Sequence, residues 1–255
     1  MISITEAQLA AWISPIFWPF LRVLAVFTAA PIFSSRAIPI RAKVALAFLV
    51  ALAAQASLPS APVIGFNDPG VLAVVIQQVG VGLAIGFAVR VVFSAVELAG
   101  EVVGFQMGLN FAAFFDPTIG GQSSAVARFF GQMTSLLFLA VNGHLLWLFA
   151  IIRSFQSFPV DQNFLETLAL MKLQHLGSGL FASALWIALP MVGILMFANL
   201  ALGILSRVAP QMNIFAVGFP ITLVVGLIGI AVTLPMLDQP FMMLLERSID
   251  VFAPK

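Results

Sequence analysis

Long apolar segments follow one another along almost the whole chain and constrain its fold more than any other feature. They cover residues 7–33, 44–58, 71–103, 125–152, 180–206 and 214–237. A helix needs about 20 apolar residues to cross a bilayer, and only 8% of the residues are charged, against about 25% in soluble domains. The sequence therefore predicts an all-α integral membrane protein with little chain left for a soluble domain.

Several classes of function are disfavoured by what the sequence lacks. The net charge of +1 gives no basic face for nucleic acid. The absence of cysteine removes disulfides, thiolate metal sites and cysteine nucleophiles. His144 is isolated among apolar residues, with no second histidine at metal-ligand spacing. We therefore expect no enzyme, no metal site and no cofactor. The first apolar segment follows no signal-peptide pattern and is expected to be retained.

The first segment carries an arginine and several prolines. Pro15, Pro19 and Pro31 predict either a kinked helix or two short ones, because each proline removes a backbone hydrogen bond. Arg22 lies in the middle of the segment, where snorkelling to the interface is difficult. We expect its guanidinium to face protein or water.

A basic connection follows, with Arg36, Arg41 and Lys43. The positive-inside rule places this connection in the cytoplasm and the N-terminus on the opposite side. The next apolar segment, residues 44–58, is short for a complete crossing.

The third segment combines glycines with two acids. Glycines at positions 80, 82 and 86, and again at 100, 104 and 108, would allow another helix to approach closely. Glu97 and Glu101 are four residues apart and share a helical face. They could form a cation or proton site, mark the end of the lipid-facing helix, or pair with a base such as Arg90. We expect the helical faces that carry Arg22, Glu97, Gly100 and Glu101 to pack against other subunits.

Residues 104–124 interrupt the apolar pattern. They are too polar and glycine-rich to cross a bilayer comfortably, yet too apolar for an ordinary solvated loop. One interpretation is a re-entrant loop that plugs a pore, and the alternative is a plain interfacial connector. The plug residues would be Phe105, Met107, Phe111, Phe114 and Phe115, and the hinges would be Gly104, Gly108, Gly120 and Gly121.

The rest of the chain is expected to form one long segment, a polar connection and a hairpin. Residues 125–152 are expected to form a single segment through Asn142-Gly143-His144, with His144 structural. A short amphipathic helix is expected over residues 162–174. The hairpin is expected to be interrupted at Gly218-Phe219-Pro220, and an amphipathic tail to lie at the interface. The hairpin turn is expected at an aqueous boundary, or to be a plain solvated turn, and contains Arg207, Pro210, Gln211 and Asn213.

Three stretches together resemble one family. They are PIFSSRAIPIRAK, NGHLLWLF and NLALGILSRVAPQMNIFAVGFP, the last covering residues 199–220. They are similar to the FliR family of bacterial flagellar export-gate proteins, whose injectisome counterpart is the T component of type III secretion. The last stretch is the most specific, because its Arg-x-Ala-Pro-Gln turn and Ile-Phe-x-x-Gly-Phe-Pro run are not explained by apolar composition.

The resemblance implies a role and a set of partners. A protein of this family would be a non-catalytic inner-membrane subunit of the flagellar basal body, part of a helical hetero-oligomeric pore with FliP and FliQ, with FlhB on the cytoplasmic side. Unfolded proteins would pass through the pore. Residues 1–177 would be FliP-like, residues 178–255 FliQ-like, and residues 105–122 the plug. The hairpin turn would lie near the cytoplasmic entrance. Two alternatives are an injectisome export gate and an ion-coupled secondary transporter that uses Glu97 and Glu101.

Overall fold

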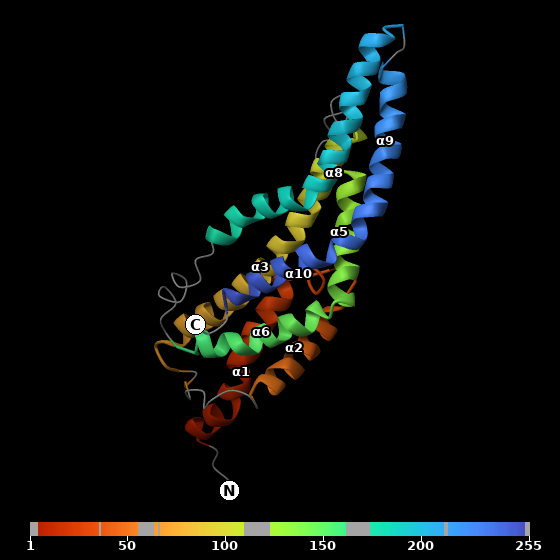
Figure 1. The fold of residues 1–255 in the computed structure, drawn as a ribbon. Helices are drawn as coiled ribbons and strands as arrows, with labels where there is room; N and C mark the ends of the chain where they lie inside the picture. Colours follow the sequence, from red (N-terminus) through yellow and green to blue (C-terminus); the bar gives the residue numbers. More distant parts are fainter. Residues whose placement is uncertain are drawn as a thin grey trace. The chain divides into compact units, whose positions relative to one another are not determined.

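A computed structural model describes residues 5–35, 37–55, 64–65, 67–109, 123–161, 174–211 and 214–252. The helices are α1 (Glu6–Ala29), α2 (Ile40–Gln55), α3 (Val71–Gln106), α5 (Ala125–Ala140), α6 (Gly143–Ser157), α8 (Gln174–Val208), α9 (Ile214–Thr233), the short 3-10 helix η2 (Leu234–Met236) and α10 (Asp238–Asp250) (Figure 1). Within these described ranges there is no β-strand. The predicted all-α fold is confirmed.

Four of the described helical spans are long and apolar enough to cross a membrane. They are Gln8–Ala29, Val71–Gln106, Leu176–Val208 and Ala216–Met236, and a fifth is formed if the bent pair α5 and α6 counts as one span. The expected short second segment is helix α2, with 16 residues. The chain is therefore a membrane protein with several apolar helices, as the sequence predicts.

The expectation of one continuous segment over residues 125–152 is wrong. The structure ends α5 at Ala140 and starts α6 at Gly143, and the two helices are bent by 72°. The backbone of Asn142 has a φ of 56°, in the left-handed region. Asparagine adopts this region more readily than most residues, so the Asn142-Gly143 pair turns the chain.

Prolines interrupt the helices less than the sequence suggests. Helix α1 is one helix that contains both Pro15 and Pro19, which excludes the alternative of two short helices. The expected interruption at Gly218-Phe219-Pro220 is also wrong, because α9 continues through Pro220. Membrane helices tolerate proline because surrounding groups can satisfy the freed carbonyl. Helix α8 contains Pro190 and bends part-way along its length (Figure 1).

The described residues belong to two compact units, each built from separate parts of the sequence. The first unit comprises residues 1–91, 142–176 and 245–255. In it, α1 packs against α2 and against the first part of α3. A Cβ atom on Gly86 would lie 2.5 Å from the Ala29 Cβ and 2.9 Å from the Val26 carbonyl oxygen, and one on Gly82 would collide with the Arg22 carbonyl oxygen. The two glycines therefore bring the backbones of α1 and α3 into direct contact.

The second unit comprises residues 92–141 and 177–244. Here the last part of α3 packs against α5, because a Cβ atom on Gly100 would lie 2.8 Å from the Ala127 Cα. Helices α8 and α9 form a hairpin and lie side by side (Figure 1). Many large apolar side chains of this hairpin are exposed, among them Trp186, Phe197 and Val208.

Candidate functional site

The segment predicted to be a plug leaves α3 at a tightly packed point on α9. Met107, directly after the last residue of α3, is fully buried. Its side chain covers Gly226 of α9 so closely that a Cβ there would lie 2.5 Å from the Met107 Cε and 2.6 Å from its Sδ. The Thr222 hydroxyl lies 3.3 Å from the Met107 carbonyl oxygen and 3.0 Å from that of Phe219. Its one hydrogen is shared between these acceptors.

The next residue, Gly108, has a backbone conformation that favours glycine. Its φ is +77°, and it is the one glycine in the described part of the chain with a positive φ. Its amide donates to the Phe105 carbonyl at 3.0 Å, which closes a turn at the end of α3. A side chain here would be strained, and a Cβ would also lie 3.4 Å from the Phe219 ring. The chain direction therefore changes immediately after Met107.

The structure separates the predicted plug and hinge residues. Phe105 is 62% exposed, whereas Met107 is 0% exposed, so the two side chains point to different surroundings. Gly104 is a buried residue within α3. Five of the predicted residues, Phe111, Phe114, Phe115, Gly120 and Gly121, lie outside the described residues. Their roles as plug and hinge, like those of Gly104 and Gly108, stay predictions.

The far end of the same segment is bonded back to α3. Glu101 Oε1 accepts a hydrogen bond from the Ser124 amide at 2.8 Å. The Ser124 side chain caps α5 by accepting from the Ala127 amide at 3.1 Å. A carboxylate at a helix N-terminus is also favoured by the helix dipole. Met107, Gly108 and Ser124 therefore each make defined contacts within the second unit.

The other predicted acid packs against α5 as well. A Cβ on Gly131 would lie 2.8 Å from the Glu97 Oε1, so the carboxylate of Glu97 rests on the α5 backbone. Glu97, Gly100 and Glu101 thus take part in the contact between α3 and α5 of the same chain. Their packing against other subunits stays a prediction.

In the first unit, Arg22 is buried and has protein partners, as expected. Its Nε donates to Gln78 Oε1 at 2.9 Å, one Nη to Ser154 Oγ at 3.1 Å, and the other Nη to the Phe158 carbonyl at 2.7 Å. The guanidinium carbon also lies 3.8 Å from the centre of the Phe155 ring. Arg22 thereby connects α1, α3 and the end of α6. Its predicted contact with another subunit stays a prediction.

Sequence reasoning missed the glutamines that extend this network. Gln78 Nε2 donates to Gln77 Oε1 at 2.7 Å, and Gln77 Nε2 donates to the Pro159 carbonyl at 3.2 Å and also contacts Asp161. Both glutamines are fully buried. The signal was an adjacent pair of amides inside an apolar segment, since buried polar groups need partners.

The remaining predicted residues belong to the α8–α9 turn and to the start of α6. Arg207, Pro210 and Gln211 are exposed at the end of α8 and in the connection to α9, and Asn213 lies outside the described residues. The side of the membrane on which this turn lies stays a prediction. His144 lies in the first turn of α6. The described ranges contain no group of three or more His, Cys, Asp or Glu side chains that could hold a metal ion.

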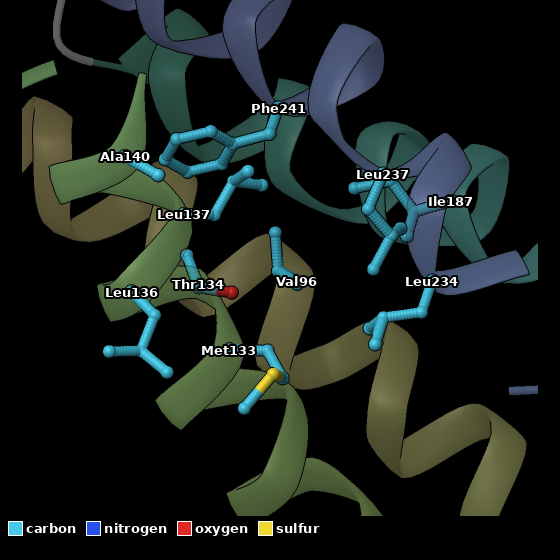
Figure 2. Close-up of a pocket in the computed structure, with 10 residues that line it drawn as sticks. All are labelled: Val96, Met133, Thr134, Leu136, Leu137, Ala140, Ile187, Leu234, Leu237 and Phe241. Carbon is cyan, nitrogen blue, oxygen red and sulfur yellow. The ribbon is translucent and has the colours of Figure 1, made fainter. Parts of the chain in front are cut away.

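A hollow of about 220 Å³ in the second unit is almost entirely apolar (Figure 2). It is lined by Val96, Met133, Thr134, Leu136, Leu137, Ala140, Ile187, Leu234, Leu237 and Phe241. The polar side chain in this lining is Thr134, whose hydroxyl donates to the Phe130 carbonyl at 2.7 Å. The lining offers packing surface but no group suited to chemistry.

Comparison with known proteins distinguishes between the export-protein and transporter interpretations of this membrane chain. Residues 13–248 match the model of a family described as bacterial export proteins, family 1. The chain belongs to this family of export proteins. The resemblance seen in the sequence is thereby confirmed.

Relatives of this export protein match over nearly their whole length. It is 40% identical to the flagellar biosynthetic protein FliR of Pectobacterium carotovorum subsp. carotovorum, covering 99% of this chain and 97% of that protein. It is also 40% identical to the protein of the same name from Escherichia coli (strain K12), covering 94% and 92%. Against the FliR of Bacillus subtilis (strain 168) the identity is 32%, covering 84% and 83%.

Proposed function

We propose that this export protein is a non-catalytic subunit of the flagellar type III export gate in the bacterial inner membrane. It forms the export pore together with FliP-like and FliQ-like subunits, and an FlhB-like subunit attaches at the cytoplasmic side. Unfolded flagellar proteins are the cargo. The observation that carries this proposal is the near full-length similarity to relatives named flagellar biosynthetic proteins. The same names favour the flagellum over an injectisome.

The proposed division of the chain is the one that the resemblance to the FliR family implies. Residues 1–177 form the FliP-like part, and residues 178–255 form the FliQ-like part, whose main feature is the α8–α9 hairpin. The exposed apolar side chains of that hairpin support packing against lipid or neighbouring membrane subunits, because such surfaces are rarely left in water.

We propose that residues 105–122 close the pore at rest. A channel wide enough for an unfolded chain would leak ions, and an apolar constriction can exclude water without any fixed charge. Phe111, Phe114 and Phe115 supply the apolar material. Support comes from both ends of the segment, since Met107 is packed on α9 and Ser124 is bonded to Glu101. A closing element held at both ends can return to the same position.

The mechanism is steric and needs no covalent step. Glu97 and Glu101 contact α5 and its N-cap, which supports a packing role for them over ion coupling. We therefore propose that movement of residues 105–122 opens and closes the pore.

The test is a conductance measurement on the assembled complex in cells. Replacing Phe111, Phe114 and Phe115 together by alanine should raise the resting ion conductance while subunit assembly is retained. Loss of export alone decides nothing, because both a plug and a simple connector could be damaged. Intact assembly with an unchanged resting conductance would show that the segment is only a connector.

A further inference from the structure

A groove with a volume of about 450 Å³ lies between α1 and α2. All of its lining belongs to the first unit. Between the first and the last α2 residue of the lining, the helix rises about 12 Å at 1.5 Å per residue, so the groove follows α2 for more than two turns. The lining consists of Phe20 of α1 and of Ile40, Arg41, Val44, Ala45 and Phe48 of α2.

Most of the groove is apolar and open at the protein surface. The rings of Phe20 and Phe48 meet edge to face, with their centroids 6.4 Å apart. Ile40 is 66% exposed and Phe48 is 45% exposed. Helix α1 provides the candidate membrane span Gln8–Ala29. Exposed apolar surface of this kind is typical of contact with a membrane or of a ligand-binding groove.

One end of the groove carries a positive charge. Arg41 lies in the first turn of α2 and is exposed. Within the described part of the chain it donates to no acceptor, whereas the neighbouring Lys43 Nζ donates to the Ser35 carbonyl at 3.0 Å. Neither the first turn of α2 nor the groove lining contains an acid. The charge of Arg41 is therefore available to an anion.

A second groove in the first unit shows a different distribution of charge. Its volume is about 210 Å³, and Arg153 lines it together with Glu246 and Asp250. The guanidinium carbon of Arg153 lies 4.4 Å from the centre of the Phe149 ring. Two carboxylates would repel an anion there. Of these two grooves, the one between α1 and α2 combines an apolar lining with positive charge alone.

We propose that the α1–α2 groove binds an anionic phospholipid. The phosphate lies against Arg41, and one acyl chain follows α2 toward Phe48 and Phe20. Lipid tails are as apolar as the groove itself, so the acyl chain determines where the lipid lies, and the charge determines which lipid is preferred. This inference goes beyond the proposed export function and does not depend on closure of the pore by residues 105–122.

The headgroup contact is tested by native mass spectrometry of the purified, delipidated export complex, titrated with phosphatidylglycerol or with zwitterionic phosphatidylcholine. The native complex should bind phosphatidylglycerol more tightly. Arg41→Gln should weaken phosphatidylglycerol binding about five-fold, the effect of one basic residue near an anionic headgroup, and should remove the preference. Lys43→Gln is the matched control, because it removes the same charge from the same connection but from a side chain that has a protein partner. It should leave the preference intact.

The acyl-chain contact is tested by filling the groove. Ala45 is exposed and lines the groove, whereas Ala53 is exposed on α2 outside the lining. Ala45→Trp should weaken phosphatidylglycerol binding at least as much as Arg41→Gln, and Ala53→Trp should leave it unchanged. In the double variant Arg41→Gln/Ala45→Trp the two losses should not multiply, because both substitutions act on one bound lipid.

Each outcome decides the proposal. Equal losses for Arg41→Gln and Lys43→Gln would show general electrostatic attraction instead of a site, and multiplying losses in the double variant would show separate lipids. A native complex that binds both phospholipids equally would show that another subunit covers the groove, which also overturns the proposal. If Ala45→Trp does not assemble, Arg41→Gln decides alone: an assembled complex that keeps its preference for phosphatidylglycerol refutes the site.

Discussion

At the scale of single residues, Arg22 is held in the first unit by burial and by hydrogen bonds together. It is fully buried within an apolar helix, and its three hydrogen bonds reach Gln78, Ser154 and the Phe158 carbonyl. A buried charge is tolerated when it is paired and hydrogen-bonded, and removal of one partner leaves the others unsatisfied. Arg22 therefore stabilises a specific arrangement of α1, α3 and the end of α6.

Replacing Arg22 by leucine should destabilise the protein by about 3–5 kcal/mol, because it leaves Gln78, Ser154 and a carbonyl without their donor. The thermal unfolding midpoint of the purified export complex measures this effect. Lysine should rescue only in part, since an ammonium cannot reproduce the planar fork of donors or the stacking on Phe155.

Arg90 provides the matched control for this prediction. It is also an arginine in an apolar helix, α3, but its side chain is exposed. Arg90→Leu should change the stability by no more than about 0.5 kcal/mol. Equal midpoints for the Arg22 and Arg90 variants would contradict the structural role of Arg22.

At the scale of helices, glycine sets how closely the elements pack. Gly82 and Gly86 admit α1, and Gly100 admits α5, so α3 contacts a different helix at each end of its glycine pattern. The glycine spacing predicted such contacts, but it could not say which helix would supply them, because the partners are distant in the sequence.

Gly82→Ala should separate α1 from α3 and destabilise the complex by about 1–3 kcal/mol, since the added methyl group meets a backbone carbonyl that cannot rotate away. Gly193→Ala in α8 is the control, because a Cβ there meets nothing within 4 Å and alanine gains up to about 1 kcal/mol in helix propensity. The unfolding midpoints of the two variants should move in opposite directions. A Gly82→Ala variant as stable as the native protein would refute the close contact.

The helices also show how much of the fold could be predicted from the sequence. Apolar length located α3 and the α8–α9 hairpin well, because these helices are defined by hydrophobic composition. It missed the break at Asn142, where one left-handed residue outweighs an unbroken apolar pattern. It also overrated Pro220 as an interruption, because the loss of one backbone hydrogen bond does not end a helix that other contacts support.

At the scale of the molecule, the exposed apolar surface of α8 and α9 implies neighbours. We expect the chain to copurify with FliP-like and FliQ-like subunits, and to be heterogeneous when expressed without them, because large apolar patches associate. Size-exclusion chromatography of the two preparations tests this. A solitary chain that is stable and monodisperse would refute the expectation.

The side on which the α8–α9 turn lies is a second prediction at this scale. Gln211 is exposed in that turn, and the chain has no cysteine, so Gln211→Cys can be labelled uniquely. We expect labelling by a membrane-impermeant reagent only from the cytoplasmic side, because the turn is proposed to lie near the cytoplasmic entrance of the export gate. Labelling from the periplasmic side alone would reverse the placement.

The sequence predicted the residue types of the candidate site, but not the contacts that these residues make. The run of glycine and phenylalanine after α3 identified the segment, but nothing in the sequence connected Met107 with Gly226 or Glu101 with Ser124. The first of these contacts joins residues far apart in the chain, and its specificity comes from the absence of a side chain at position 226. Arg22 likewise predicted a buried partner, but the sequence did not indicate that Ser154 and Phe158 would accept its hydrogen bonds.

The length of α3 has a consequence for how the protein meets its bilayer. Its 36 residues extend about 54 Å at 1.5 Å per residue, whereas a hydrocarbon core is about 30 Å thick. Tilt alone would have to reach about 56°, beyond the roughly 40° that membrane helices adopt. A substantial part of this apolar helix must therefore lie outside the hydrocarbon, where protein rather than lipid has to cover it. An apolar segment in this chain therefore indicates surface that other protein covers, as well as helix that crosses the membrane.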